Sequence, residues 1–161
     1  MPIAVGDKIP DVEVRTLGAD GAPQAVRTGE VLGTGRVVLF AVPGAFTPGC
    51  SKIHLPGFVQ GADDILAKGV DKIACISVND AWVMDAWGRE QGAGDKIAML
   101  ADGNGEFTKA MGLEFDGGVV GLGVRSQRYS AIIEDGVITD LNVEPKSGVD
   151  VSSCENTLAH L

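Results

Sequence analysis

The chain has 161 residues, of which 45% are hydrophobic and 22% charged, close to the average of globular proteins. This composition excludes disordered, collagen-like and low-complexity chains, and the length predicts a single domain over residues 1–161. The formal net charge of −9 argues against nucleic acids and anionic membranes as partners, because both repel a negatively charged protein.

The sequence also predicts a cytoplasmic protein. No apolar run reaches about 18 residues, and the first residues lack the basic flank and apolar stretch of a signal peptide. Cys50, Cys75 and Cys154 are an odd number of cysteines without a C-x-x-C pair, which disfavours a disulfide framework and a four-thiolate zinc site. At least one of them is therefore expected to be a free thiol.

Three short apolar runs are typical of parallel strands that are covered on both faces. They are residues 36–42, 72–78 and 96–101. Helices are expected between them, over 47–58, over 62–68 with a stop at Gly69, and over 81–91 with a stop at Gly92. Leu55-Pro-Gly57 is expected to end the first of these helices.

The last part of the chain predicts a hairpin and a final helix. Residues 129–134 and 137–143 flank Asp135-Gly136, a strong signal for a two-residue turn. Ser152-Ser-Cys-Glu155 reads as an S-x-x-E capping box that opens a helix running to residue 161. The order β-α-β-α-β followed by β-β-α predicts an α/β thioredoxin-like fold. Its central mixed sheet is flanked by helices, with an N-terminal extension before residue 36 and an insertion between residues 101 and 129.

The residues around Cys50 favour a reactive thiolate. The chain leaves a buried strand and enters a helix there, with Thr47 suited to the N-cap and Pro48 to the first helical position. Cys50 is then the third helical residue, where free N–H groups and the helix dipole stabilise a thiolate. Because a more acidic thiol is also a weaker nucleophile, ionisation alone gains only about twofold in rate at pH 7. Fast chemistry needs donors aimed at the sulfur, and Thr47 is one candidate.

The motif Pro43-x-x-x-Thr47-x-x-Cys50 resembles the peroxidatic motif of peroxiredoxins, and its context through Gly57 resembles the type II branch of that family. The resemblance continues in Ser77-Val-Asn-Asp-Ala-Trp82, Leu100-Ala-Asp102, Gly123-Val-Arg-Ser-Gln-Arg-Tyr-Ser130 and Asn142-Val-Glu-Pro145. It implies a thiol peroxidase that reduces hydrogen peroxide and organic hydroperoxides without a cofactor or a metal.

The resemblance also implies the role of each residue at the site. Cys50 attacks the peroxide, Thr47 hydrogen-bonds the sulfur and the peroxide oxygen, and Pro43 shields the pocket. Arg128 supplies the fixed cation that holds the thiolate and polarises the O–O bond. Arg125 competes with Arg128 for this role, and on residue type alone it is expected to be a solvated loop charge.

His54 opens an alternative, because it lies four residues after Cys50 on the same helical face and could serve as the base of an acyl-transfer enzyme. No orienting Asp or Asn stands at a recognisable spacing, and the resemblance places His54 and Gly49 in the surroundings of the site. Metal binding by Cys50, His54, Cys154 and His160 is disfavoured because no thiolates are closely spaced. An interaction protein on a thioredoxin-like scaffold would leave the Thr-Pro-Gly-Cys spacing unexplained.

A sulfenic acid on Cys50 must be reduced by another thiol. Cys75 and Cys154 are the internal candidates for this resolving thiol. Cys75 lies within a strand that reads as buried, so packing is its expected role. Cys154 is expected at the second position of the final helix, where the helix start should lower its pKa. The resemblance implies a resolving cysteine near this position in animal members of the family, but in a loop before the final helix rather than inside its capping box. The leading expectation is an outside thiol, supplied by glutathione with glutaredoxin or by thioredoxin.

The resemblance further implies a compact homodimer. Phe46 and Trp82 are its interface candidates, because the loop around the cysteine motif and the segment after residue 77 form the interface in type II enzymes.

Overall fold

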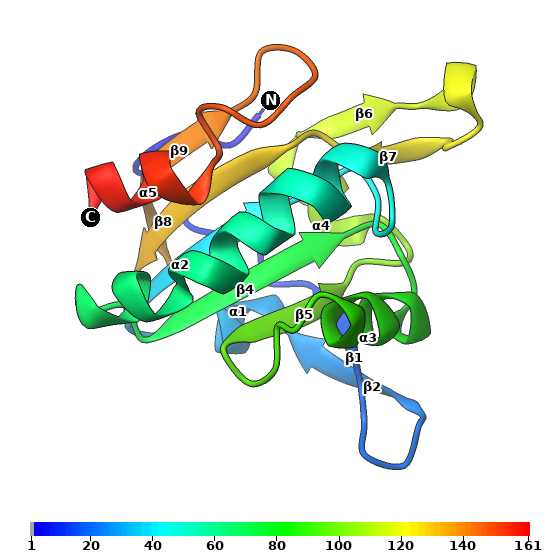
Figure 1. Cartoon of the computed structure of the whole chain (residues 1–161), viewed down its shortest axis with the longest axis horizontal. Helices are drawn as coiled ribbons and strands as arrows, with labels where there is room; N and C mark the ends of the chain where they lie inside the picture. Colours follow the sequence, from blue (N-terminus) through cyan, green and yellow to red (C-terminus); the bar gives the residue numbers. More distant parts are fainter. Residues whose placement is uncertain (1) are drawn as a thin grey trace.

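The computed structural model describes residues 2–161 and is built around a seven-stranded sheet in the order β2-β1-β5-β4-β3-β8-β9 (Figure 1). The strands of this sheet are β1 (Glu13–Leu17), β2 (Pro23–Arg27), β3 (Arg36–Ala41), β4 (Lys72–Ser77), β5 (Ile97–Ala101), β8 (Tyr129–Glu134) and β9 (Val137–Val143). Strands β3, β4 and β5 run parallel, whereas the other pairs are antiparallel. The predicted mixed sheet is confirmed, with all five predicted strands in it.

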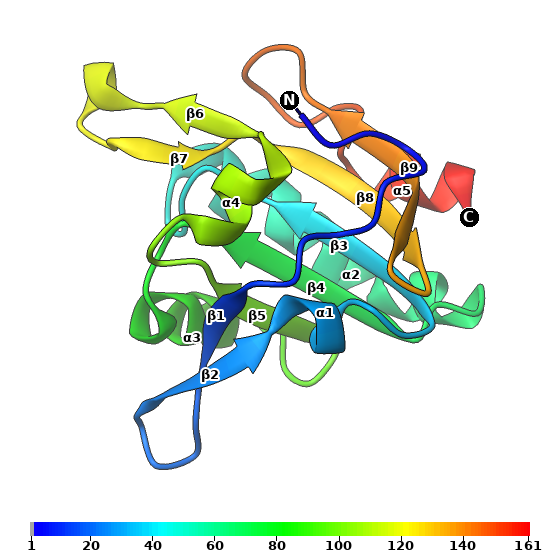
Figure 2. The ribbon, with the colours of Figure 1, turned by 180° about the vertical axis from the view of Figure 1, so that it is seen from behind.

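Helices cover both faces of the sheet. They are α1 (Thr28–Val31), α2 (Leu55–Ala67), α3 (Ala81–Glu90), α4 (Glu106–Met111) and α5 (Cys154–His160). Figure 1 shows α2, α3 and α5 on one face, and Figure 2 shows α1, α4 and the N-terminal segment on the other. None of the helices within residues 2–161 has the length and apolar character that crossing a membrane requires.

After Arg36, the strand β3 is apolar at every position because both of its faces are covered. Phe40 packs with Phe58 of α2 in one buried cluster, while Leu39 packs with Phe107 of α4 in the other. Alternate residues of a strand point to opposite faces, so where a strand is covered on both sides successive residues are apolar. The two clusters form the core above and below the sheet.

The predicted hairpin between β8 and β9 is confirmed. Asp135 and Gly136 have φ angles of 49° and 84°, as a type I′ turn requires, and Glu134 pairs with Val137 across it. The hairpin places β8 beside β3, so that the start of β8 lies next to the end of β3, where the chain turns toward Cys50.

The N-terminal extension and the insertion contain elements that the sequence does not predict individually. The extension forms the β1–β2 hairpin and α1. The insertion forms α4 and a separate two-stranded sheet of β6 (Glu114–Asp116) and β7 (Val124–Ser126), with a 3-10 turn over Gly118–Val120 at its tip. Each of these elements has only three to six residues, which is too few to show the apolar periodicity that marks an element in the sequence.

The expected helix end at Leu55-Pro-Gly57 is wrong. The helical chain starts at Pro48 and continues through α2 to Ala67, with Cys50–His54 in π-helical geometry. The N–H of Leu55 donates to the carbonyl of Cys50, five residues earlier. In a regular α-helix the ring of Pro56 would clash with the carbonyl four residues earlier, and the wider π turn relieves that clash. The predicted stop at Gly69 is confirmed by its positive φ of 89° just after the helix.

The expected capping box is displaced by one residue. Ser153, rather than Ser152, is the N-cap of α5, and its side chain accepts a hydrogen bond from the N–H of Asn156. The Ser152 hydroxyl donates instead to the Glu144 carboxylate. Cys154 is therefore the first residue of α5, because a long-range partner competes for the serine that the local pattern selects.

Candidate active site

Cys50 lies in the first turn of the helix that follows β3, at the carboxyl end of that strand. The carbonyl of Thr47 accepts the N–H of Ser51 at 2.9 Å, which makes Thr47 the N-cap and Cys50 the third helical residue, as predicted. The Cys50 side chain is fully buried. Its environment is therefore set by the few groups that contact the sulfur.

Arg128 provides the polar contact to that sulfur. Its Nη2 donates to Cys50 Sγ at 3.1 Å, and its Nη1 donates to His54 Nδ1 at 2.9 Å. A guanidinium is planar and always charged, so one rigid group serves both partners. A Cβ at Gly49 would lie 3.2 Å from Nη2, so the glycine gives the guanidinium room to reach the sulfur.

His54 is a neutral, fully occupied imidazole. Because Nδ1 accepts from Arg128, the hydrogen resides on Nε2, which donates to the carbonyl of Ser152 at 2.9 Å. Burial, together with the charge of Arg128, lowers the pKa of His54 to about 3. With both nitrogens engaged and protonation disfavoured, His54 does not act as a base toward Cys50, which removes the geometry that acyl transfer needs.

Thr47 makes a different hydrogen bond from the expected one. Its hydroxyl donates to the carbonyl of Gly44 at 2.6 Å. The hydroxyl hydrogen is thus directed away from the Cys50 sulfur, while the oxygen keeps lone pairs that can accept from a bound hydroxyl group.

The two candidate arginines are separated by their contacts. Arg125 donates through Nε to the carbonyl of Leu122 at 2.9 Å, within the inserted segment, whereas Arg128 contacts Cys50. The arginine selected by the resemblance is the one that the fold brings to the sulfur.

Cys75 lies in β4 and is fully buried in the cluster that also contains Cys50. Burial, and then the neighbouring Cys50, raise the pKa of Cys75 well above its usual value. A thiol that resists ionisation in the centre of a sheet fits the predicted packing role.

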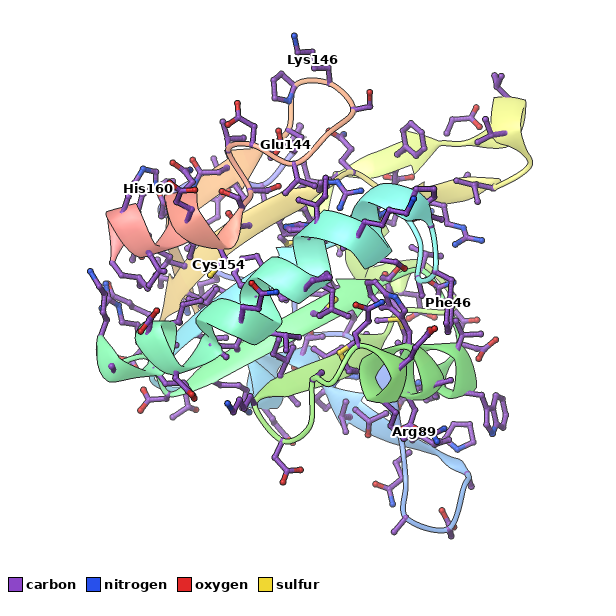
Figure 3. The ribbon with its side chains drawn as sticks, in the orientation of Figure 1. Phe46, Arg89, Glu144, Lys146, Cys154 and His160 are labelled. Carbon is purple, nitrogen blue, oxygen red and sulfur yellow. The ribbon has the colours of Figure 1, made fainter. Side chains whose placement is uncertain are left out.

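The expected low pKa of Cys154 is wrong. Burial, with a further contribution from Asp64, raises the pKa of this thiol to about 11. Cys154 is the first residue of α5 and its side chain faces α2 (Figure 3), where a side chain at Gly61 would overlap its sulfur. A Cβ at Gly57 would lie 3.9 Å from the Cys154 Cβ, and one at Gly61 would lie 3.8 Å from it. These glycines are seven and eleven residues beyond Cys50 along one helix, about 10 and 16 Å at about 1.5 Å per residue. A disulfide requires Cα atoms within about 7 Å, so Cys50 and Cys154 are not placed to form one.

The four residues weighed as metal ligands do not converge. Both nitrogens of His54 have protein partners, and His160 Nδ1 contacts Asp140 at 2.9 Å. Within residues 2–161, no group of three or more His, Cys, Asp or Glu side chains is arranged to hold a metal ion.

A groove of about 420 Å³ adjoins the site. Pro43 and Arg128 form part of its wall, and Phe115 and Pro145 add apolar surface. Its rim also carries acidic residues from β6 and from the loop after β9, together with Lys146 (Figure 3). The groove is large enough to hold a small organic group.

Both dimer candidates expose aromatic surface. Phe46 is 51% exposed, with a positive φ of 66°, and Trp82 is 56% exposed. Phe46 projects beside α3, the helix that carries Trp82 (Figure 3).

The sequence indicates no role at the site for Glu144 or for the Ser152 carbonyl. Ser152 contacts His54, and Glu144 binds Ser152. The sequence signal for Glu144 is its place in Asn142-Val-Glu-Pro145, a polar motif shared with the type II family without a role implied for the glutamate.

Comparisons with known proteins find similar sequences over nearly the whole chain. The Redoxin family model matches residues 4–158. The chain is 50% identical over 163 residues to "Peroxiredoxin-2E-2, chloroplastic" of Oryza sativa subsp. japonica. This alignment covers 99% of this chain and 72% of that protein. It is 42% identical over 160 residues to "Peroxiredoxin-2B" of Arabidopsis thaliana, covering 99% of each.

Solved structures give the same result. Reduced Prx3 from Vibrio vulnificus in complex with hydrogen peroxide has a TM-score of 0.93 at 51% identity, covering 98% of each chain. Peroxiredoxin 5 from Alvinella pompejana has a TM-score of 0.86 at 37% identity, covering 98% of this chain and 97% of that one. These similarities confirm the expected thioredoxin-like fold.

Proposed function

This chain belongs to the type II peroxiredoxins of the Redoxin family and is a thiol-dependent peroxidase, and we propose that Cys50 is the thiol that reacts with the peroxide. The observation that carries this proposal is the 3.1 Å contact between Arg128 Nη2 and Cys50 Sγ. It brings a permanent positive charge to a cysteine at a helix start, the arrangement that makes a thiolate reactive.

In the proposed reaction, the Cys50 thiolate attacks the hydroxyl-bearing oxygen of the peroxide. An S–O bond forms and the O–O bond breaks, so that the sulfur is oxidised to a sulfenic acid and the peroxide is reduced. The leaving oxygen takes up a proton and departs as water or an alcohol. Arg128 stabilises the negative charge on sulfur and on the leaving oxygen, Thr47 accepts the peroxide O–H, and Pro43 excludes water.

We propose that an external thiol restores Cys50. The sulfenic acid would exchange with one thiol to give a mixed disulfide and water, and a second thiol would release Cys50. Supporting this are the raised pKa values of Cys75 and Cys154 and the distance along the helix between Cys50 and the Cys154 contacts at Gly57 and Gly61. Glutathione with glutaredoxin, or thioredoxin, remains the predicted reductant.

Organic hydroperoxides are proposed as substrates beside hydrogen peroxide. The groove of about 420 Å³ beside Pro43 and Arg128 could hold the organic group while the O–O bond faces Cys50. A homodimer through Phe46 and Trp82 is likewise a proposal, supported by the aromatic surface that both residues expose. A cytoplasmic location remains a prediction, with which the three free thiols are compatible.

The role of Cys50 is tested by peroxide consumption with dithiothreitol as reductant. We expect Cys50→Ser to abolish turnover and Cys75→Ala to retain it, because Cys75 is a packing residue. Turnover by Cys50→Ser, confirmed with protein free of contaminating peroxidases, would overturn the assignment of the reacting thiol.

The external-thiol proposal is tested by mass spectrometry after one equivalent of hydrogen peroxide without reductant. We expect Cys50 to be trapped as a sulfenic acid by dimedone, with no peptide joining Cys50 to Cys154 or Cys75. A stoichiometric cross-linked peptide containing either pair would show an internal resolving thiol instead.

A further inference from the structure

Glu144 follows β9 and is bonded directly to the backbone of Arg128. Its N–H donates to the carbonyl oxygen of Arg128 at 2.9 Å, at the start of β8. Figure 3 shows Glu144 where the loop that joins β9 to α5 leaves the sheet. The residue therefore lies between the strand that carries Arg128 and the loop that returns toward the active site.

The Glu144 side chain holds the far end of that loop. Its Oε2 accepts from the N–H of Asp150 at 2.7 Å, the N–H of Ser152 at 2.8 Å and the hydroxyl of Ser152 at 2.6 Å. Residues 145–148 are exposed, so the loop between these anchor points has little apolar contact with the core. The carboxylate is thus a principal internal anchor of the loop.

From Ser152 the contacts lead back to Arg128. The Ser152 carbonyl accepts from His54 Nε2 at 2.9 Å, and His54 Nδ1 accepts from Arg128 Nη1 at 2.9 Å. The other guanidinium nitrogen, Nη2, donates to Cys50 Sγ. Glu144, Ser152 and His54 therefore close a ring of hydrogen bonds that begins at the Arg128 backbone and ends at its guanidinium.

This ring answers a physical need of the site. An arginine side chain has many rotamers, and a cation stabilises a transition state only if it is held in place before the reaction. His54 can orient the guanidinium only while its own ring is fixed, and the Ser152 carbonyl fixes it. Although burial opposes ionisation of Glu144, its hydrogen bonds with Ser152 and Asp150 lower its pKa, so the anchor is charged at neutral pH.

We propose that Glu144 is a positioning residue for the peroxidase reaction: its carboxylate fixes Ser152, so that His54 holds the Arg128 guanidinium on the Cys50 sulfur. Glu144 itself touches neither sulfur nor peroxide. The inference rests on the proposed roles of Cys50 and Arg128.

The test is the second-order rate constant for oxidation of Cys50 by hydrogen peroxide, measured by stopped flow in single and double variants. We expect Glu144→Ala to slow the reaction about tenfold, in the range found when an outer positioning partner is lost. In an Arg128→Ala background, which is itself much slower than wild type, the same substitution should change the rate less than about twofold, because its effect passes through Arg128. The matched control is Asp140→Ala, which removes a nearby carboxylate in β9 that is bonded to Asn142 and His160, and should leave the rate unchanged.

Hydrogen peroxide is used because Glu144 also lines the groove, and a small peroxide does not need the groove. Should Glu144→Ala fail to fold, Glu144→Gln keeps the size of the side chain, and a smaller loss of rate that again vanishes without Arg128 is expected. An unchanged rate in a folded Glu144 variant, or an equal loss with and without Arg128, would overturn the inference. If Arg128→Ala itself reacts at the wild-type rate, the proposed function of Arg128 fails instead, so the two failures are distinguishable.

Discussion

At the scale of single residues, the fold sets the protonation state and the hydrogen-bonding role of the side chains at the site. His54 keeps a neutral imidazole because it is buried beside the Arg128 guanidinium, and its hydrogen is directed to the Ser152 carbonyl. A histidine four residues after a cysteine suggests a catalytic base from the sequence, yet in the structure it serves as an acceptor for Arg128. Its chemistry is set by its neighbours rather than by its spacing.

His54 makes the stability of the protein depend on pH. Its pKa is about 3 in the native state, compared with 6.5 for an unperturbed histidine, so below pH 6.5 the unfolded chain binds a proton that the native state does not. We therefore expect the free energy of unfolding to fall by about 2 kcal/mol from this residue between pH 7 and pH 5. Urea unfolding across this range measures the slope.

The matched variant for this experiment is His54→Gln, which keeps a donor and an acceptor but cannot be protonated. Asp102, whose pKa burial raises, acts in the opposite direction, and comparison with His54→Gln removes its contribution. If wild type and His54→Gln lose the same stability between pH 7 and pH 5, the buried neutral histidine is not the cause.

At the scale of elements, the helix that begins at Pro48 joins the active site to the C-terminal helix. Its first turn carries Cys50, its π-helical turn carries His54, and Gly57 and Gly61 farther along α2 face Cys154 of α5. The π turn accommodates Pro56 without ending the helix. The sequence predicts the start at Thr47-Pro48 and the stop at Gly69, but it divides this stretch into two helices, over 47–58 and 62–68, whereas the structure has one continuous helix. The compensation for proline that joins the two depends on tertiary packing.

The contact between Gly61 and Cys154 gives a test of helix packing. In an open helix Gly→Ala is favourable by about 1 kcal/mol, but here the new Cβ would overlap the Cys154 sulfur, and we expect Gly61→Ala to destabilise the protein by about 1–3 kcal/mol. In a Cys154→Ala background the nearest atom of residue 154 is its Cβ, at 3.8 Å, which is an ordinary contact.

The same substitution should therefore become neutral or stabilising in that background. Urea unfolding of the two single variants and the double variant measures the coupling between the two sites. Equal effects of Gly61→Ala with and without the Cys154 sulfur would contradict the close packing of α2 on α5.

At the scale of the whole molecule, one seven-stranded sheet uses strands from both ends of the chain, with β1 and β2 at one edge and β9 at the other. This arrangement supports the prediction of a single domain over residues 1–161, which stays a prediction. The net charge of −9 is spread over a molecule whose exposed apolar residues include Phe46 and Trp82.

The proposed homodimer is tested at this scale by sedimentation velocity. We expect Phe46→Asp and Trp82→Asp to shift the protein toward monomer, because each places a charge where aromatic surface would be buried. Val5→Asp is the matched control, because Val5 is 60% exposed and lies away from Phe46 and Trp82. The next residue, Gly6, donates its N–H to the carbonyl of Ile138 in β9. Strand β9 lies at the opposite edge of the sheet from β1, against which α3 packs. A wild-type protein that sediments as a monomer at all concentrations would refute the dimer itself.

The sequence by itself determined the features that depend on a few adjacent residues. The buried strands, the Asp135-Gly136 turn and the helix start at Thr47-Pro48 are set by side-chain pattern and backbone preference over short distances. The motif around Cys50 belongs to the same group, since its Pro, Thr and Cys lie within one loop and one helical turn.

Tertiary structure decided the features that depend on residues far apart in the chain. The contact of Arg128 with Cys50 joins positions 78 residues apart, and that of His54 with Ser152 joins positions 98 apart. No local sequence pattern predicts contacts between residues so far apart. Nor does it predict the burial of Cys154, which raises the pKa of this thiol although a helix start alone would lower it. Helix propensity and capping act between neighbours, whereas the position of a cation and the desolvation of a thiol arise only when the sheet has brought distant segments together.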